Sequence, residues 1–148
     1  MDYTSDQNNS RVSTGKARRY SLIIIVLIFV FGTVRALSGQ HGTVTAQVDE
    51  EKLGVVGSYG EVVFIYLEDI TQVQLVENLM TGTAVDAQET KNTMCGLYEN
   101  EAYGTYTLHI FTEKQPYIVV TYGDGEVLVF NQANKRQTEN IYEDLTQS

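Results

Sequence analysis

The residues able to carry out chemistry are few and scattered in this 148-residue chain. His41 and His109 are its two histidines, and Cys95 is its one cysteine. A catalytic histidine needs a nucleophile or carboxylate partner, and the sequence shows no such constellation. We therefore predict that His109 is a half-exposed strand residue, sharing a face with Thr107 and Phe111. A small hydrolase that uses His109 and nearby acids remains an alternative.

Cys95 excludes two kinds of site by being alone. One cysteine cannot close an internal disulfide or supply a multi-cysteine zinc site. Its surroundings match no nucleophile motif, and no serine lies in a Gly-x-Ser-x-Gly elbow. We expect Cys95 to be a small core residue. The Gly57-Ser-Tyr-Gly60 segment lacks the lysine of a phosphate loop and is interpreted as a turn.

Acidic residues occur in three groups, Asp49-Glu50-Glu51, Glu68-Asp69 and Glu143-Asp144. Glycoside hydrolysis needs two carboxylates that face each other, whereas adjacent strand residues point to opposite faces. Asp124-Gly-Glu126 offers too few oxygens for calcium. We expect solvated surface acids, and predict no catalytic, cofactor-binding or metal-ligating residue.

Charge divides the chain into two unlike parts. Residues 1–36 carry five basic and two acidic side chains, a net charge of +3. Residues 37–148 carry five basic and 17 acidic side chains, a net charge of −12. Nucleic acids and anionic lipid head groups attract surplus lysine and arginine. We therefore expect neither a nucleic-acid partner nor an anionic-lipid head-group site.

An apolar segment separates these parts. Ten residues, Leu22–Phe31, are apolar without a break, and residues 20–37 are long enough to form a transmembrane helix. Four basic residues precede it, which predicts a basic, disordered tail over 1–19 that stays in the cytoplasm. The segment is a membrane anchor in this interpretation. Cleavage near Ser38, which would release a secreted domain, is the alternative.

From residue 43 onward, short β-branched and aromatic runs alternate with glycine, asparagine and aspartate. Asp124-Gly125 predicts a tight hairpin, and Asn134 predicts the N-cap of a helix that packs through Ile141 and Leu145. Eight tyrosines in this region suit a β core better than a ligand-facing patch. The predicted strands are Val44–Val48, Leu53–Val56, Glu61–Tyr66, Ile70–Val76, Ala84–Gln88, Gly104–Phe111, Tyr117–Tyr122 and Glu126–Phe130.

Aliphatic, glycine and turn positions form one pattern over roughly residues 50–146. Its members are Leu53–Val56, Tyr103–Leu108, the hairpin 119–125, and Val129–Asn131 with Thr138, Tyr142 and Leu145. This pattern resembles the bacterial pleckstrin-homology-like (PH-like) domains attached to membrane segments in Gram-positive bacteria. The resemblance implies a mainly β domain over 43–148, with two bent sheets of about seven antiparallel strands and a C-terminal capping helix. It also implies a non-enzymatic module that needs no cofactor.

These expectations together describe a single-pass membrane protein. Its N-terminus lies in the cytoplasm, residues 20–37 bind the membrane, and an acidic domain lies outside the cytoplasm. The domain is expected to act by contact with an unknown protein or peptide. An exposed strand edge offers one way to bind an extended peptide.

Overall fold

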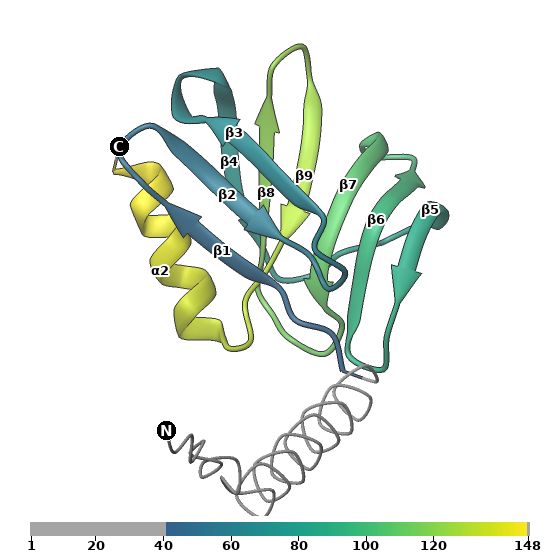
Figure 1. The fold of residues 1–148 in the computed structure, drawn as a ribbon. Helices are drawn as coiled ribbons and strands as arrows, with labels where there is room; N and C mark the ends of the chain where they lie inside the picture. The colour runs from purple at the N-terminus through teal and green to yellow at the C-terminus, as the bar shows by residue number, and fades with distance from the viewer. Residues whose placement is uncertain (1–40, 148) are drawn as a thin grey trace, which may run out of the picture. The chain divides into compact units, whose positions relative to one another are not determined.

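The computed structural model of this chain describes residues 41–147 (Figure 1). The predicted tail 1–19, the predicted transmembrane segment 20–37 and the cleavage position near Ser38 lie outside the described residues. Within 41–147, no helix is long and apolar enough to cross a membrane.

Residues 41–147 form nine strands, one short 3-10 turn and one α-helix, in a mainly β domain with two sheets. Short runs of β-branched and aromatic residues end at glycine, asparagine or aspartate, as strands in such domains do. The elements are β1 Thr45–Val48, β2 Lys52–Val56, β3 Val62–Tyr66, η1 Leu67–Asp69, β4 Ile70–Val76, β5 Thr83–Glu89, β6 Thr93–Asn100, β7 Gly104–Phe111, β8 Tyr117–Tyr122, β9 Glu126–Phe130 and α2 Lys135–Thr146.

A small sheet has the strand order β1-β2-β3, and a large sheet has the order β4-β8-β9-β7-β6-β5. The expectation of only antiparallel strands is wrong at one pair, because β7 and β9 are parallel. The chain reverses direction into β8 and again into β9, and β9 lies between β7 and β8. A strand in that position must run in the direction of β7.

Strand β6 is the one strand among residues 41–147 that the sequence did not predict. Gly96 lies in its middle with a φ of +131°, a conformation that side-chain-bearing residues rarely adopt. A Cβ there would lie 2.4 Å from the carbonyl oxygen of Asp86 on β5, beside an irregularity in the β5 register. Gly96 allows this close approach. Glycine is uncommon inside strands, so the same residue also interrupts the sequence pattern from which a strand is predicted.

The central strands of the large sheet, β7, β8 and β9, carry buried residues on both faces. The first face of the sheet packs against the small sheet and α2 through residues such as Leu53, Ile118 and Phe130, a cluster that we call the first core. Its second face carries Tyr98, Tyr106, Leu108, Ile110, Tyr117, Val119 and Val129, the second core. Residues 77–82 connect β4 and β5 at opposite edges of the sheet, and within this connection Leu79 packs against the second core.

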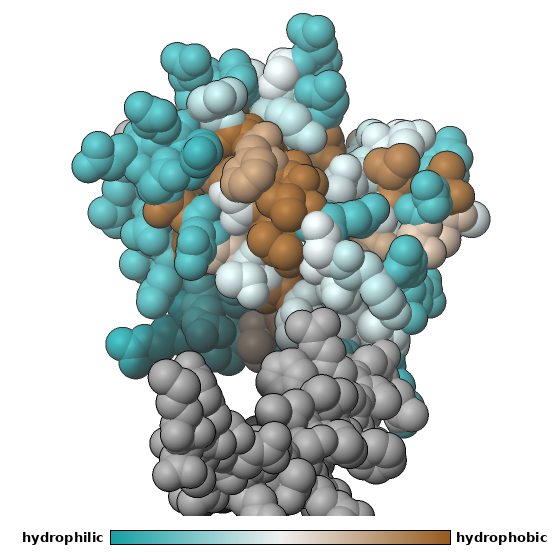
Figure 2. All heavy atoms as spheres, viewed as in Figure 1, coloured by the Kyte–Doolittle hydropathy of each residue, from teal (hydrophilic) through white to brown (hydrophobic). Residues whose placement is uncertain are grey.

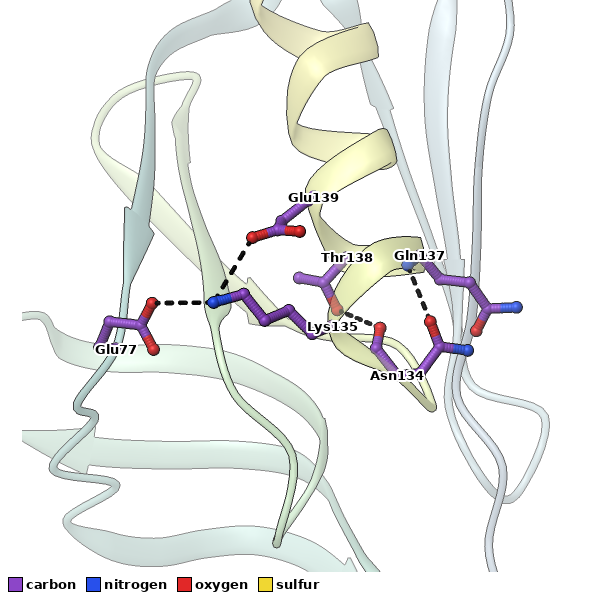
Figure 3. A network of polar contacts seen from close by, with 6 residues as sticks. All are labelled: Glu77, Asn134, Lys135, Gln137, Thr138 and Glu139. Carbon is purple, nitrogen blue, oxygen red and sulfur yellow. Dashed lines mark hydrogen bonds and ion pairs between the residues drawn. The ribbon is translucent and has the colours of Figure 1, made fainter.

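Helix α2 begins where the sequence predicts. The side chain of Asn134 accepts a hydrogen bond from the backbone N–H of Gln137 at 3.0 Å (Figure 3). Leu145 is buried in the first core, and Ile141 and Tyr142 pack against it. The predicted hairpin is also present, since β8 and β9 pair from Ile118–Phe130 to Tyr122–Glu126. Both local predictions are therefore confirmed.

Candidate functional site

The outer face of the small sheet is the surface on which exposed apolar side chains gather in a row. Val62, Phe64 and Tyr66 alternate along β3 with relative exposures of 47%, 67% and 57%. Val56 on β2 lies opposite Val62 and is also exposed. Figure 2 shows hydrophobic surface at the centre of this side of the domain, with hydrophilic side chains around it. We call these four residues the β3 face.

Three rows of side chains cross the outer side of the small sheet. The strand register places Thr45 beside Val56 and Val62, and Gln47 beside Gly54 and Phe64. Lys52 lies opposite Tyr66. Alternate residues of paired strands share one face, so these residues form rows across the sheet. Each row begins with a polar residue on β1 or β2 and ends with Val62, Phe64 or Tyr66 on β3.

Gly54 leaves room for the Phe64 ring to lie across β2. A Cβ on Gly54 would come within 3.1 Å of that ring, so a side chain there would require the ring to shift. The ammonium group of Lys52 lies 5.5 Å from the centre of the same ring, within range of a cation–π contact. Phe64 is thereby held on the sheet although its outer side is exposed to solvent.

A shallow hollow of about 350 Å³ lies beside Phe64. Thr45, Gln47, Asp49 and Lys52 supply hydrogen-bonding groups along it, and Gly54, Val56 and Phe64 supply its apolar part. Such a mixture of one aromatic ring, aliphatic groups and a few polar side chains suits a peptide-like ligand.

A second hollow, of about 400 Å³, adjoins Tyr66. Glu50, Glu51 and Glu68 line it together with Tyr66 and Leu67. The predicted surface acids are therefore confirmed as exposed at these three positions, but they also share one hollow. A hollow with three carboxylates attracts cationic groups.

Asp49, although adjacent, has a structural role in the β1–β2 turn. Its side chain accepts backbone N–H groups of Glu51 at 2.9 Å and of Lys52 at 2.8 Å. These two hydrogen bonds lower the pKa of Asp49 below its ordinary value. The carboxylate is thus already engaged by its own turn.

His109 is not half-exposed, as the sequence suggested, but fully buried. The prediction was wrong because both faces of β7 are covered at this point, one by each core. Burial lowers the pKa of His109 to about 4, and neither ring nitrogen has a hydrogen-bond partner among the described residues. A Cβ on Gly57 would lie 2.5 Å from its Nδ1, so the ring packs closely against that glycine.

Cys95 on β6 is buried as expected. It belongs to a polar cluster that also contacts Gly42, near the first described residue. Its sulfur lies 3.4 Å from the Ser58 hydroxyl, which lies 2.6 Å from the Thr93 hydroxyl. Thr93 in turn contacts the Thr90 hydroxyl at 2.8 Å, and Thr90 accepts the backbone N–H of Gly42. These contacts join segments far apart in the chain. No described contact links Ser58 or Cys95 to a ring nitrogen of His109.

Most of the tyrosines among residues 41–147 form the core, as predicted. The hydroxyl of Tyr98 donates to Glu89 at 2.9 Å, and that of Tyr106 donates to the Thr81 carbonyl at 2.7 Å. Burial raises the pKa of both hydroxyls, that of Tyr106 to about 12. Two other tyrosines, Tyr59 and Tyr66, lie outside the core and are exposed.

The sequence reasoning missed the β3 face, although a signal for it was present. A strand with one solvated side normally alternates apolar and polar residues, whereas Val62–Tyr66 is apolar at all five positions. Such a run indicates burial on both sides or an exposed apolar side. Among residues 41–147, no group of three His, Cys, Asp or Glu side chains is arranged to hold a metal ion.

Comparison of the chain with protein-family models, curated proteins and solved structures gives no match. The geometry of the domain and the chemistry of the sequence are therefore the basis for assigning a function.

Proposed function

We propose that this chain is a non-enzymatic binding module, anchored in the membrane by residues 20–37, which presents a PH-like domain outside the cytoplasm. The observation that carries the proposal is the β3 face, where Val62, Phe64 and Tyr66 are exposed side by side on one strand. Contiguous apolar surface with a polar rim is typical of interaction sites. The partner in this proposal is a protein or peptide.

The PH-like part of the proposal is supported by the two sheets and by α2, which packs on the first core at the end of the chain. The parallel β7–β9 pair departs from the arrangement that the resemblance implies. The functional part does not depend on the family, because it follows from exposed side chains.

The membrane anchor is supported by the sequence alone, through the apolar run Leu22–Phe31 and the basic residues before it. Mass spectrometry and fractionation of the expressed full chain test it. A membrane-bound product of full mass supports the anchor, and a soluble product that begins near Ser38 supports the secreted alternative. Protease added outside intact protoplasts should degrade the β domain.

A photo-crosslinking amino acid placed at position 64 of the full chain tests binding in cells. We expect a discrete crosslinked product from position 64 and none from position 85, since Val85 is similarly exposed but lies on β5. Crosslinking at position 64 should disappear when Tyr66→Ser and Val62→Ser are also introduced. Equal crosslinking from both positions would reject a specific β3 face.

A further inference from the structure

The two sheets have four edge strands, and β3 differs from the other three. Helix α2 packs against β1 and β4. Strand β5 carries Asp86 and Glu89 and an irregular register, which are common protections of an exposed edge. Strand β3 has no charged residue, no proline and no register shift. An unprotected apolar edge is either a hazard or a docking strand.

The hydrogen-bond pattern shows which residues of β3 face this edge. The N–H of Gly57 donates to the Glu61 carbonyl, and the N–H of Leu67 donates to the Glu51 carbonyl, both at 2.8 Å. Bonded pairs alternate in an antiparallel ladder, so Val63 and Ile65 are the β3 residues bonded to β2. The N–H and C=O groups of Val62, Phe64 and Tyr66 point to the free edge.

Among residues 41–147, the backbone groups of these three residues at the free edge have no partner, and their side chains are apolar and exposed. We infer that β3 accepts an extended peptide as a fourth strand of the small sheet. This inference rests on the proposed function and specifies how the β3 face is used. Backbone hydrogen bonds then supply affinity, and alternate side chains of the peptide lie beside Val62, Phe64 and Tyr66.

Acidic side chains lie at both ends of the strand and define the peptide further, whereas Lys52 lies opposite Tyr66 on the β2 side, away from the free edge. Glu61 precedes β3, and the hollow of Glu50, Glu51 and Glu68 follows it at Tyr66. The domain as a whole carries −12. The occupant is accordingly a segment with apolar residues at alternate positions and Lys or Arg at the end that lies beside Tyr66.

A second copy of the chain fits this edge less well. Antiparallel pairing of two β3 strands centred on Phe64 would bring Glu61 of each copy near Glu68 of the other. Like charges that face each other across strands are destabilising. Charge complementarity thus favours a cationic peptide over self-association.

Amide hydrogen exchange of the full chain in detergent micelles tests this inference. The probe is a capped nine-residue peptide with valine at alternate positions and two lysines at one end. We expect exchange at Val62, Phe64 and Tyr66 to slow by about tenfold or more when the peptide is saturating. Exchange at Val63 and Ile65 should change little, because β2 already protects them.

Three controls separate the parts of the inference. The same peptide with N-methylated amides on its pairing edge should not bind. A peptide with glutamates in place of the lysines should bind at least about fivefold more weakly at low salt. Glu68→Lys should weaken binding of the lysine peptide by about fivefold, whereas Glu101→Lys, at another exposed position, should not.

Each contrary result rejects a defined statement. Equal affinity for both peptides overturns the cationic end, and binding of the N-methylated peptide overturns strand addition. No peptide binding, together with specific crosslinking at position 64, also overturns strand addition and leaves the proposed function intact. A concentration-dependent dimer that Phe64→Ser abolishes would instead identify a second copy as the occupant. Loss of crosslinking as well would reject the proposed function itself.

Discussion

The most unusual single residue in the domain is His109, a buried histidine whose ring nitrogens have no hydrogen-bond partner among the described residues. Burying an unpaired polar group costs free energy, and burying it as a cation costs more. The ring therefore stays neutral in the folded domain. The buried His109 ring therefore affects the stability of the domain and is not part of the β3 face.

Because the pKa of His109 falls from 6.5 to about 4 on folding, the unfolded state binds a proton more readily. The stability linked to this residue is fully present above pH 6.5 and is lost as the pH falls toward 4, by up to about 3 kcal/mol. Urea unfolding of residues 40–148 between pH 7 and 4 measures it. His109→Leu should flatten the pH dependence.

Gly125 tests the hairpin between β8 and β9. Its φ is +111°, and a Cβ there would meet no atom within 4 Å. Gly125→Val should therefore lower stability only through backbone strain, by about 1 to 3 kcal/mol. Thermal melts compare it with Glu68→Ala, which should stay within about 0.5 kcal/mol of the original domain. A loss of stability for Gly125→Val no larger than that for Glu68→Ala would contradict the predicted turn.

At the scale of elements, the start of α2 depends on one side chain. Asn134→Ala removes the acceptor for the Gln137 N–H and should lower stability by about 1 kcal/mol. Asn140 is an exposed residue inside the same helix. Asn140→Ala should leave stability equal or slightly higher, because alanine is the better helix former. Chemical denaturation distinguishes the two variants.

Elements with local signals were predictable from the sequence. The Asp-Gly turn and the Asn134 cap depend on neighbouring residues alone, and both are present. Strand β6 was missed because Gly96 serves a contact with β5 that no local pattern shows. The β3 face was missed because exposure depends on what covers a strand, and the sequence does not reveal which of four edges stays open.

At the scale of the whole molecule, charge predicts weak attraction to membranes. The basic residues of the domain are dispersed, and Lys135 lies 3.9 Å from Glu77 and 3.6 Å from Glu139 (Figure 3). Each exposed cation near an anionic surface contributes only about 1 kcal/mol. Residues 40–148 should not sediment with anionic vesicles at low salt. Saturable binding that salt abolishes would contradict this prediction.

The parallel β7–β9 ladder joins the β5-β6-β7 meander to the other half of the large sheet, β4-β8-β9. Three residue pairs connect β7 to β9, whereas eight connect β6 to β7 and five connect β8 to β9. Beyond the ladder, the buried Asn131 side chain bonds the Phe111 N–H and carbonyl and the Lys114 carbonyl, taking the place of further backbone pairs. The shortest ladder of the large sheet is thus reinforced by the Asn131 side chain and by the second core, whose residues come from both sides of it.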